Sequence, residues 1–101
     1  MIVVIARAKI RPEKRDGFLA AAAAVCVETS RAESGNMAYD VYESATETNA
    51  FVVLERWKSH EDNRAHLQSA HTQDFLRAMA QSVAEMPRIE AITPAKIDML
   101  A

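Results

Sequence analysis

The sequence predicts an α+β fold in which helices pack on one face of a small antiparallel sheet. β-Branched and aromatic residues gather in three short runs, at positions 2–10, 37–45 and 50–58. An alanine-rich run at 20–24 separates the first two, and alanine is the strongest helix former. The 101 residues show no change of composition that would mark a linker, so we expect a single domain over 1–101.

The first run, Ile2 to Ile10, has the pattern of a β-strand. All of its even-numbered positions are apolar, as a buried strand face requires. The odd-numbered positions begin with Val3 and Ile5 and turn basic at Arg7. Both faces of the first half of this strand therefore need apolar cover.

The second and third runs predict a hairpin, because four polar residues at 46–49 join them. The third run is apolar on both faces. Its residues Phe51, Val53 and Trp57 share one face with Glu55, which is an unusual place for a carboxylate.

Apolar periodicity predicts a helix between the first two strands. Pro12 stands at its start, where a missing N–H costs nothing. The inward stripe of this helix contains Phe18, Ala22, Val25 and Thr29. We expect Gly35 to end the helix as a left-handed residue.

The residues after the third strand predict two further helices and a last strand. Ser-His-Glu-Asp at 59–62 matches a helix start signal, and a short helix is expected to about Ser69. A second helix is expected from near Thr72 to Pro87. The tail at 88–100 has the pattern of a fourth strand, with its proline at an edge or bulge.

This order of elements is the β-α-β-β-α-β plan of ferredoxin-like folds. Its helices cover one sheet face only. The other face carries apolar side chains from the first and third strands, at Val3, Ile5, Val52 and Leu54. An uncovered apolar face indicates a partner, and we expect a homodimer whose two sheets pack face to face.

Charge and composition argue against several classes of protein. A net charge of -2 gives no electrostatic case for nucleic acid. No apolar run approaches the roughly 20 residues that span a bilayer, and the first residues lack the basic region of a signal peptide. We therefore expect a cytoplasmic protein that binds neither membrane nor nucleic acid. The single cysteine, Cys26, excludes an internal disulfide framework.

Neither metal nor nucleotide chemistry has a clear sequence signal. His60, His66 and His71 are spaced by six and five residues, whereas ligands on one helix face are three or four apart. Cys26 falls on an alanine-rich helix, where a small buried thiol is mostly packing. Two glycines leave little room for a phosphate-binding loop. We expect no metal and no cofactor.

Several polar side chains nevertheless face apolar surroundings, and helices on a sheet often leave a pocket between the two layers. The candidates for such a pocket are Arg7, Asn36, Tyr39, Glu55, Trp57, His66 and His71. Each also has a structural interpretation. Glu55 can pair with a basic residue of its own or a neighbouring strand, Trp57 can belong to the core, and His66 can simply be hydrogen-bonded in a helix.

Three stretches resemble the antibiotic biosynthesis monooxygenase family. Residues 30–39, S-R-A-E-S-G-N-M-A-Y, are similar to its S-R-x-E-x-G-N-x-x-Y stretch. Glu55 and Trp57 match its E-x-W signal, and residues 66–75 match its H-x-x-S and H-x-x-x-F signals. The similarity covers nearly the whole chain, strand order included.

The resemblance implies a dimeric α+β barrel and, as in some members of that family, oxidation of quinols or anthrones by O₂ without metal, flavin or haem. Such chemistry needs a general base, an oxyanion donor and a dry pocket. We expect His66 to act as the base, Glu55 to orient it or to anchor a hydroxyl, and Asn36 to hold a substrate oxygen. The substrate-binding residues are expected to be Arg7, Tyr39, Phe51, Trp57, His71 and Phe75.

Other activities of the resembling family stay open. A sugar-phosphate isomerase would need a basic cluster, which Arg7, Lys9 and Arg11 at the first strand, or Arg31, could provide. A non-catalytic dimeric module that binds a small molecule would leave His66 and Glu55 with structural roles. Haem degradation is disfavoured, because the first strand has Arg7 where that branch has asparagine.

Overall fold

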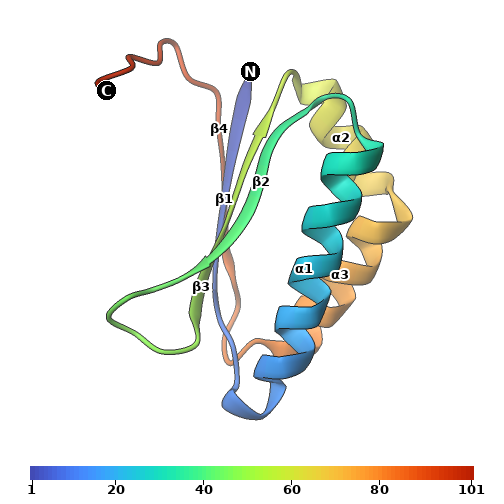
Figure 1. Ribbon diagram of the computed structural model, residues 1–101, viewed down its shortest axis with the longest axis vertical. Coiled ribbons are helices and arrows are strands. Elements are labelled where there is room, and N and C mark those ends of the chain that lie inside the picture. Colours follow the sequence, from blue (N-terminus) through green and yellow to red (C-terminus); the bar gives the residue numbers. More distant parts are fainter.

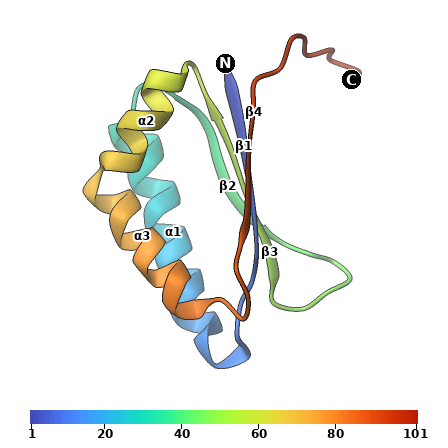
Figure 2. The same cartoon turned by 180° about the vertical axis from the view of Figure 1, so that it is seen from behind.

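A four-stranded antiparallel sheet forms one layer of the molecule, and two long helices lie side by side on one of its faces (Figures 1 and 2). The computed structural model describes residues 1–101. The strands follow the order β2-β3-β1-β4 across the sheet. The elements are β1 (Ile2–Lys9), a 3₁₀ turn η1 (Pro12–Lys14), α1 (Arg15–Ala32), β2 (Asn36–Glu43), β3 (Ala50–Trp57), α2 (His60–Gln68), α3 (Ala70–Ser82) and β4 (Arg88–Ile92). The ferredoxin-like prediction is confirmed.

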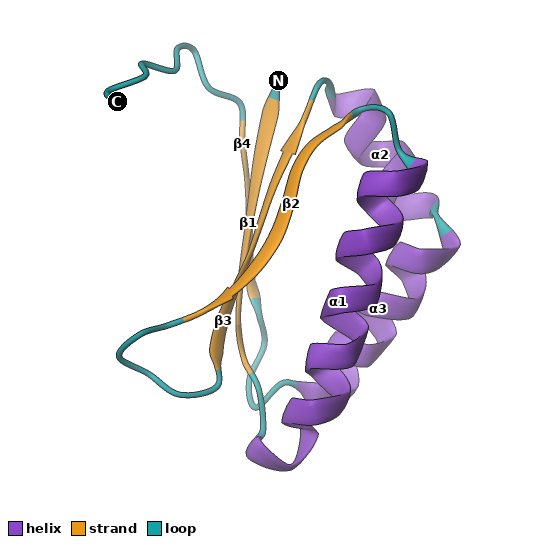
Figure 3. Ribbon diagram, in the orientation of Figure 1, coloured by secondary structure: helices purple, strands orange, loops and turns teal.

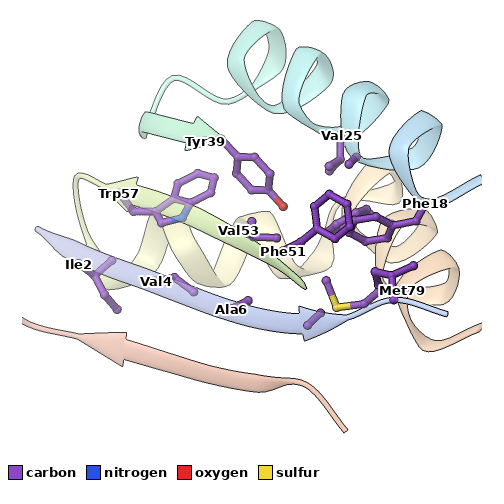
Figure 4. Close-up of a cluster of buried hydrophobic side chains, with 14 residues drawn as sticks. Ile2, Val4, Ala6, Phe18, Val25, Tyr39, Phe51, Val53, Trp57 and Met79 are labelled. Carbon is purple, nitrogen blue, oxygen red and sulfur yellow. The ribbon is translucent and has the colours of Figure 1, made fainter. Parts of the chain in front are cut away.

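The sheet and the helices form two layers (Figure 3), and the buried apolar side chains form the core between them. β1 buries its even-numbered side chains there, as the alternation predicts. The same layer receives Phe18, Ala22, Val25 and Thr29, which are the four buried residues of α1. At one end Phe18 packs on Phe51 and Phe75, with ring centroids 5.0 and 5.9 Å away (Figure 4).

Gly35 follows α1, but the prediction that it is left-handed is wrong, because no glycine has a positive φ. Its role is close approach. A Cβ built on Gly35 would overlap the Asp62 side chain. That carboxylate accepts a hydrogen bond from Ser59, which caps α2. Glycine therefore lets the end of α1 pack against the start of α2.

The end of the chain also differs from the prediction. α3 stops at Ser82, not Pro87, because the following residues pair with the end of β1: Ala84 donates to the Lys9 carbonyl and Val83 forms a bridge with Ile10. The last strand ends at Ile92, well before residue 100, since Pro94 has no N–H for a ladder.

The second face of the sheet has no helix over it, as Figure 1 shows. Its central residues Val3, Ile5, Val52 and Leu54 are only half-buried. The hairpin loop between β2 and β3 and the C-terminal tail both project on this side, at opposite ends of the sheet (Figures 1 and 2).

Candidate functional site

A buried histidine is the centre of the candidate site. His66 lies near the end of α2 and is 2% exposed. Its Nδ1 is 2.7 Å from Oε2 of Glu33, the residue that caps the end of α1. Burial lowers the pKa of His66, and the hydrogen bond to Glu33 offsets this only in part. The neutral ring then donates through Nδ1 to Glu33 and keeps an acceptor at Nε2.

A break between two helices brings the second histidine to the same carboxylate. Ser69 has extended backbone angles between α2 and α3, and its hydroxyl donates to the His66 carbonyl at 2.7 Å. The chain turns there, and Nε2 of His71 comes within 2.8 Å of Glu33 Oε2. The spacing rule for ligands on one helix face does not apply to His66 and His71, because the two residues lie on different helices, α2 and α3.

Glu55 faces His66 from the sheet. It is buried on β3 and accepts a hydrogen bond of 2.9 Å from Trp57 Nε1, two residues along the same strand face. Its Oε1 is 3.8 Å from His66 Nε2. Burial raises the pKa of Glu55 to about 7, and the nearby Glu33 carboxylate adds to this rise. Glu55 therefore pairs with Trp57 rather than with a basic residue of its own or a neighbouring strand.

Aromatic rings enclose the imidazole of His66. The Trp57 ring centroid is 4.5 Å away and that of Tyr39, on β2, is 5.4 Å away. Burial raises the pKa of Tyr39, and the charge of Glu55 raises it further, so the phenol stays protonated. Trp57 and Tyr39 also belong to the buried cluster in Figure 4. The site is thus a polar group in which Glu55 and His66 are buried and Glu33 is partly exposed.

Two of the expected site residues are engaged elsewhere. The Asn36 side-chain amide donates a hydrogen bond to the Ala38 carbonyl at an irregularity in the β2–β3 pairing. This amide therefore stabilises the backbone. Arg7 lies on the uncovered face of the sheet, where it pairs with Glu90 at 3.1 Å. Tyr39, Glu55, Trp57, His66 and His71 do come together.

The expected phenylalanines stand at the far end of the core. Phe51 and Phe75 pack with Phe18 there. Each also touches a cavity. A space of about 450 Å³ on the hairpin side is lined by Phe51, and one of about 310 Å³ between α1 and α3 is lined by Phe75. Trp57 lines neither cavity, so these spaces differ from the expected layer pocket.

One residue of the site, Glu33, was not among the predicted candidates. Glu33 lies within the S-R-A-E-S-G-N stretch but received no role, although it binds both histidines. Thr29 lies one turn earlier on α1, fully buried, and its hydroxyl has no hydrogen-bond partner. Glu33 caps α1 four residues after Thr29, and this spacing from a residue of the inward stripe was the signal that could have indicated an inward position.

Comparison with known proteins identifies the class to which this fold and site belong. The family model described as antibiotic biosynthesis monooxygenase matches residues 1–78. The chain belongs to this family. The match covers every side chain of the site and ends before β4.

Individual relatives agree. "Putative monooxygenase YcnE" of Bacillus subtilis is 46% identical over 76 residues, covering 75% of this chain and 79% of that protein. A solved structure described as "Putative antibiotic biosynthesis monooxygenase from Nitrosomonas europaea" superposes with a TM-score of 0.87 and 28% identity, covering 95% of this chain and 100% of that one. Rv0793 from Mycobacterium tuberculosis superposes with a TM-score of 0.86 and 29% identity, covering 99% of this chain and 98% of that one.

None of the helices combines the length and the apolar character that a bilayer span requires.

Proposed function

We propose that this protein is a monooxygenase that oxidises a quinol- or anthrone-like aromatic substrate with O₂ and without a cofactor. The observation that carries the proposal is the pair formed by Glu33 and His66 beside Glu55. A carboxylate that accepts from Nδ1 fixes the tautomer in which Nε2 is the base, and surrounding aromatic rings keep water away.

The proposed reaction begins when His66 Nε2 removes a proton from a substrate hydroxyl or from the acidic carbon of an anthrone. The electron-rich anion then gives one electron to O₂, and the resulting radical and superoxide join in a C–O bond. The imidazolium returns its proton to the peroxide. Cleavage of the O–O bond leaves one oxygen on carbon as a carbonyl, and the other leaves as water with the two hydrogens that the substrate loses.

The protein's part in this scheme is acid–base and electrostatic. Glu33 stabilises the imidazolium that forms on His66. With its pKa of about 7, Glu55 is partly protonated near neutral pH and can donate a hydrogen bond to a developing oxyanion. Trp57 and Tyr39 would hold an aromatic ring. Asn36 and Arg7 take no part in the proposed reaction, because the Asn36 amide donates to the Ala38 carbonyl and the Arg7 guanidinium pairs with Glu90.

Isotope incorporation tests the reaction class directly. Purified protein in EDTA is given a panel of quinols and anthrones under ¹⁸O₂. One ¹⁸O atom in the product and one O₂ consumed per substrate, without hydrogen peroxide, would support a monooxygenase. A product without ¹⁸O, or no O₂ consumption across the panel, would contradict the proposal.

A non-catalytic module that binds a small molecule is the second candidate. It is favoured by the close burial of His66 and Trp57, and by cavities that lie away from Glu55. Saturable binding of a quinol without O₂ consumption would identify this function. The sugar-phosphate alternative has less support, because Arg7 is paired with Glu90 and Lys9 lies near Glu47 and Glu85.

The proposal includes a homodimer formed through the uncovered sheet face. Its central apolar residues are half-buried, and Tyr42 on the same face is 54% exposed. The hairpin loop and the C-terminal tail project beyond this face at its two ends (Figure 2). Both segments could therefore contact the edges of a second copy packed on this face. A partner sheet would remove the apolar side chains from water.

A further inference from the structure

We infer that Glu33, His66 and His71 form a binding site for a divalent transition-metal ion such as Zn²⁺. One ligand atom from each residue is available, and the three atoms lie within 4.8 Å of one another. Glu33 Oε2 is 2.7 Å from His66 Nδ1 and 2.8 Å from His71 Nε2. The three residues come from the end of α1, from α2 and from α3, so only the folded chain assembles them.

The donor set fits zinc-like ions. Two imidazole nitrogens and one carboxylate oxygen, with a fourth position for water, are a recurrent tetrahedral zinc arrangement. Metal–ligand bonds of about 2.0–2.2 Å put neighbouring ligand atoms about 3.3 Å apart. The two spacings from Glu33 to the histidines are about half an ångström shorter, as expected where protons occupy the gaps, and all three ligand atoms lie within 4.8 Å of one another. A metal ion would replace the two protons that the histidines share with Glu33.

Groups around the three residues suit a metal site. If His66 binds through Nδ1, its Nε2 carries the remaining proton and faces Glu55 at 3.8 Å. A second carboxylate in this position commonly orients a metal-bound histidine. The hydroxyl of Ser69 is 3.2 Å from His71 Nε2, and that of Thr72 is 3.1 Å from His66 Nδ1. Two hydroxyl groups thus lie beside the two imidazole ligands.

An ion can reach the site through the space between the helices. The cavity of about 310 Å³ between α1 and α3 has His71 in its wall, with Glu28 and Asp74 nearby. The His71 and Glu33 side chains retain 19% and 15% exposure, whereas His66 is closed off. His71 and Glu33 are thus the accessible ligands, and His66 is the inner one.

Metal binding is a separate property from the proposed oxidation. An ion on Nδ1 forces the proton of His66 onto Nε2, which removes the lone pair that the base role requires. His66 therefore cannot bind a metal ion through Nδ1 and act as a base through Nε2 at the same time. The binding test below makes no use of activity, so its outcome does not depend on the proposed function.

The test is titration calorimetry and thermal unfolding of the EDTA-treated, full-length protein with ZnCl₂. We expect one ion per chain and a rise in Tm with Zn²⁺, and no rise with Mg²⁺, which prefers oxygen ligands. His71→Ala and Glu33→Gln should each weaken Zn²⁺ binding by at least about 10-fold. Both side chains are partly exposed, so these variants are expected to fold.

The chain offers a matched control. His60 is the third histidine and is exposed on α2, where its Nε2 is 3.1 Å from Thr93. His60→Ala should bind Zn²⁺ as the unmodified protein does. Absorption of the Co²⁺-loaded protein gives a second readout, because tetrahedral Co²⁺ has strong visible bands. Absence of 1:1 binding, equal binding by His71→Ala, or loss of binding in His60→Ala would overturn the inference.

Discussion

Oε2 of Glu33 lies 2.7 Å from Nδ1 of His66, although 33 residues separate them in the chain. This contact joins the end of α1 to the end of α2 inside the protein. It defines which nitrogen of His66 is the donor and which is the acceptor. Both proposals use this relationship, one with a proton between the two atoms and the other with a metal ion.

Glu33→Gln should lower the rate of O₂ consumption by about 10²–10⁴-fold, because a neutral amide stabilises the imidazolium of His66 poorly. If Glu33 acts through His66, kcat should fall more than KM changes, and the pH profile should shift. Steady-state oxygen-electrode kinetics in EDTA measure both. His60→Ala is the control with unchanged kinetics, and an unaltered kcat in Glu33→Gln would remove this residue from the mechanism.

One equivalent of Zn²⁺ should inhibit O₂ consumption, and EDTA should restore it. The reason is that the ion takes Nδ1 of His66 and leaves Nε2 protonated. The measurement is the initial rate during a Zn²⁺ titration of the active protein. Inhibition with a midpoint far from the calorimetric Kd would show that the ion acts at another site.

Glu55 should make stability depend on pH. Its pKa is about 7 in the folded chain against an ordinary 4.5, so the folded state binds more protons than the unfolded state between these values. Stability therefore falls as pH rises from about 4.5 to 7, by about 3 kcal/mol in total, and levels off above. His66 opposes this trend: its pKa is lowered, so its contribution is lost as pH falls below about 6.5.

Comparison with Glu55→Gln separates the two groups. The substituted amide stays neutral and can still accept from Trp57, so the variant should gain stability relative to the unmodified protein as pH rises through this window. Urea unfolding in EDTA at several pH values gives the difference. A difference that does not change with pH would mean that Glu55 is charged in the folded state.

Gly35→Ala should destabilise the protein by about 1–3 kcal/mol, because the new Cβ meets the Asp62 side chain at the start of α2. Gly17 is the matched control. It lies on α1 with nothing within 4 Å of a built Cβ, so Gly17→Ala should stabilise by about 0.5–1 kcal/mol through helix propensity. Denaturant unfolding checks both, and a neutral Gly35→Ala would show that Asp62 moves aside freely.

Leu54→Glu should convert a dimer into monomers, since it places a charge at the centre of the uncovered sheet face. Light scattering after size exclusion at micromolar concentration measures the mass. Asp74→Lys, on the opposite side of the molecule in α3, is the control and should leave the mass unchanged. A stable monomer before any substitution would exclude the proposed dimer.

The order of the elements and their inward faces follow from local patterns in the sequence. The even positions of β1 and the stripe from Phe18 to Thr29 are buried as their periodicity predicts. These signals are readable because burial imposes a repeat of 2.0 or 3.6 residues on local sequence. The residue types of the site were visible too: Glu55 stood out as a carboxylate on an apolar face.

Which side chains meet depends on how the helices pack in three dimensions. Glu33 reaches both histidines because the ends of three helices converge, and His71 turns toward it because Ser69 interrupts the helix. Asn36 and Arg7 had suitable chemistry, but backbone pairing and the sheet face direct them elsewhere. Contacts across 33 residues depend on packing angles, and no local repeat in the chain encodes these.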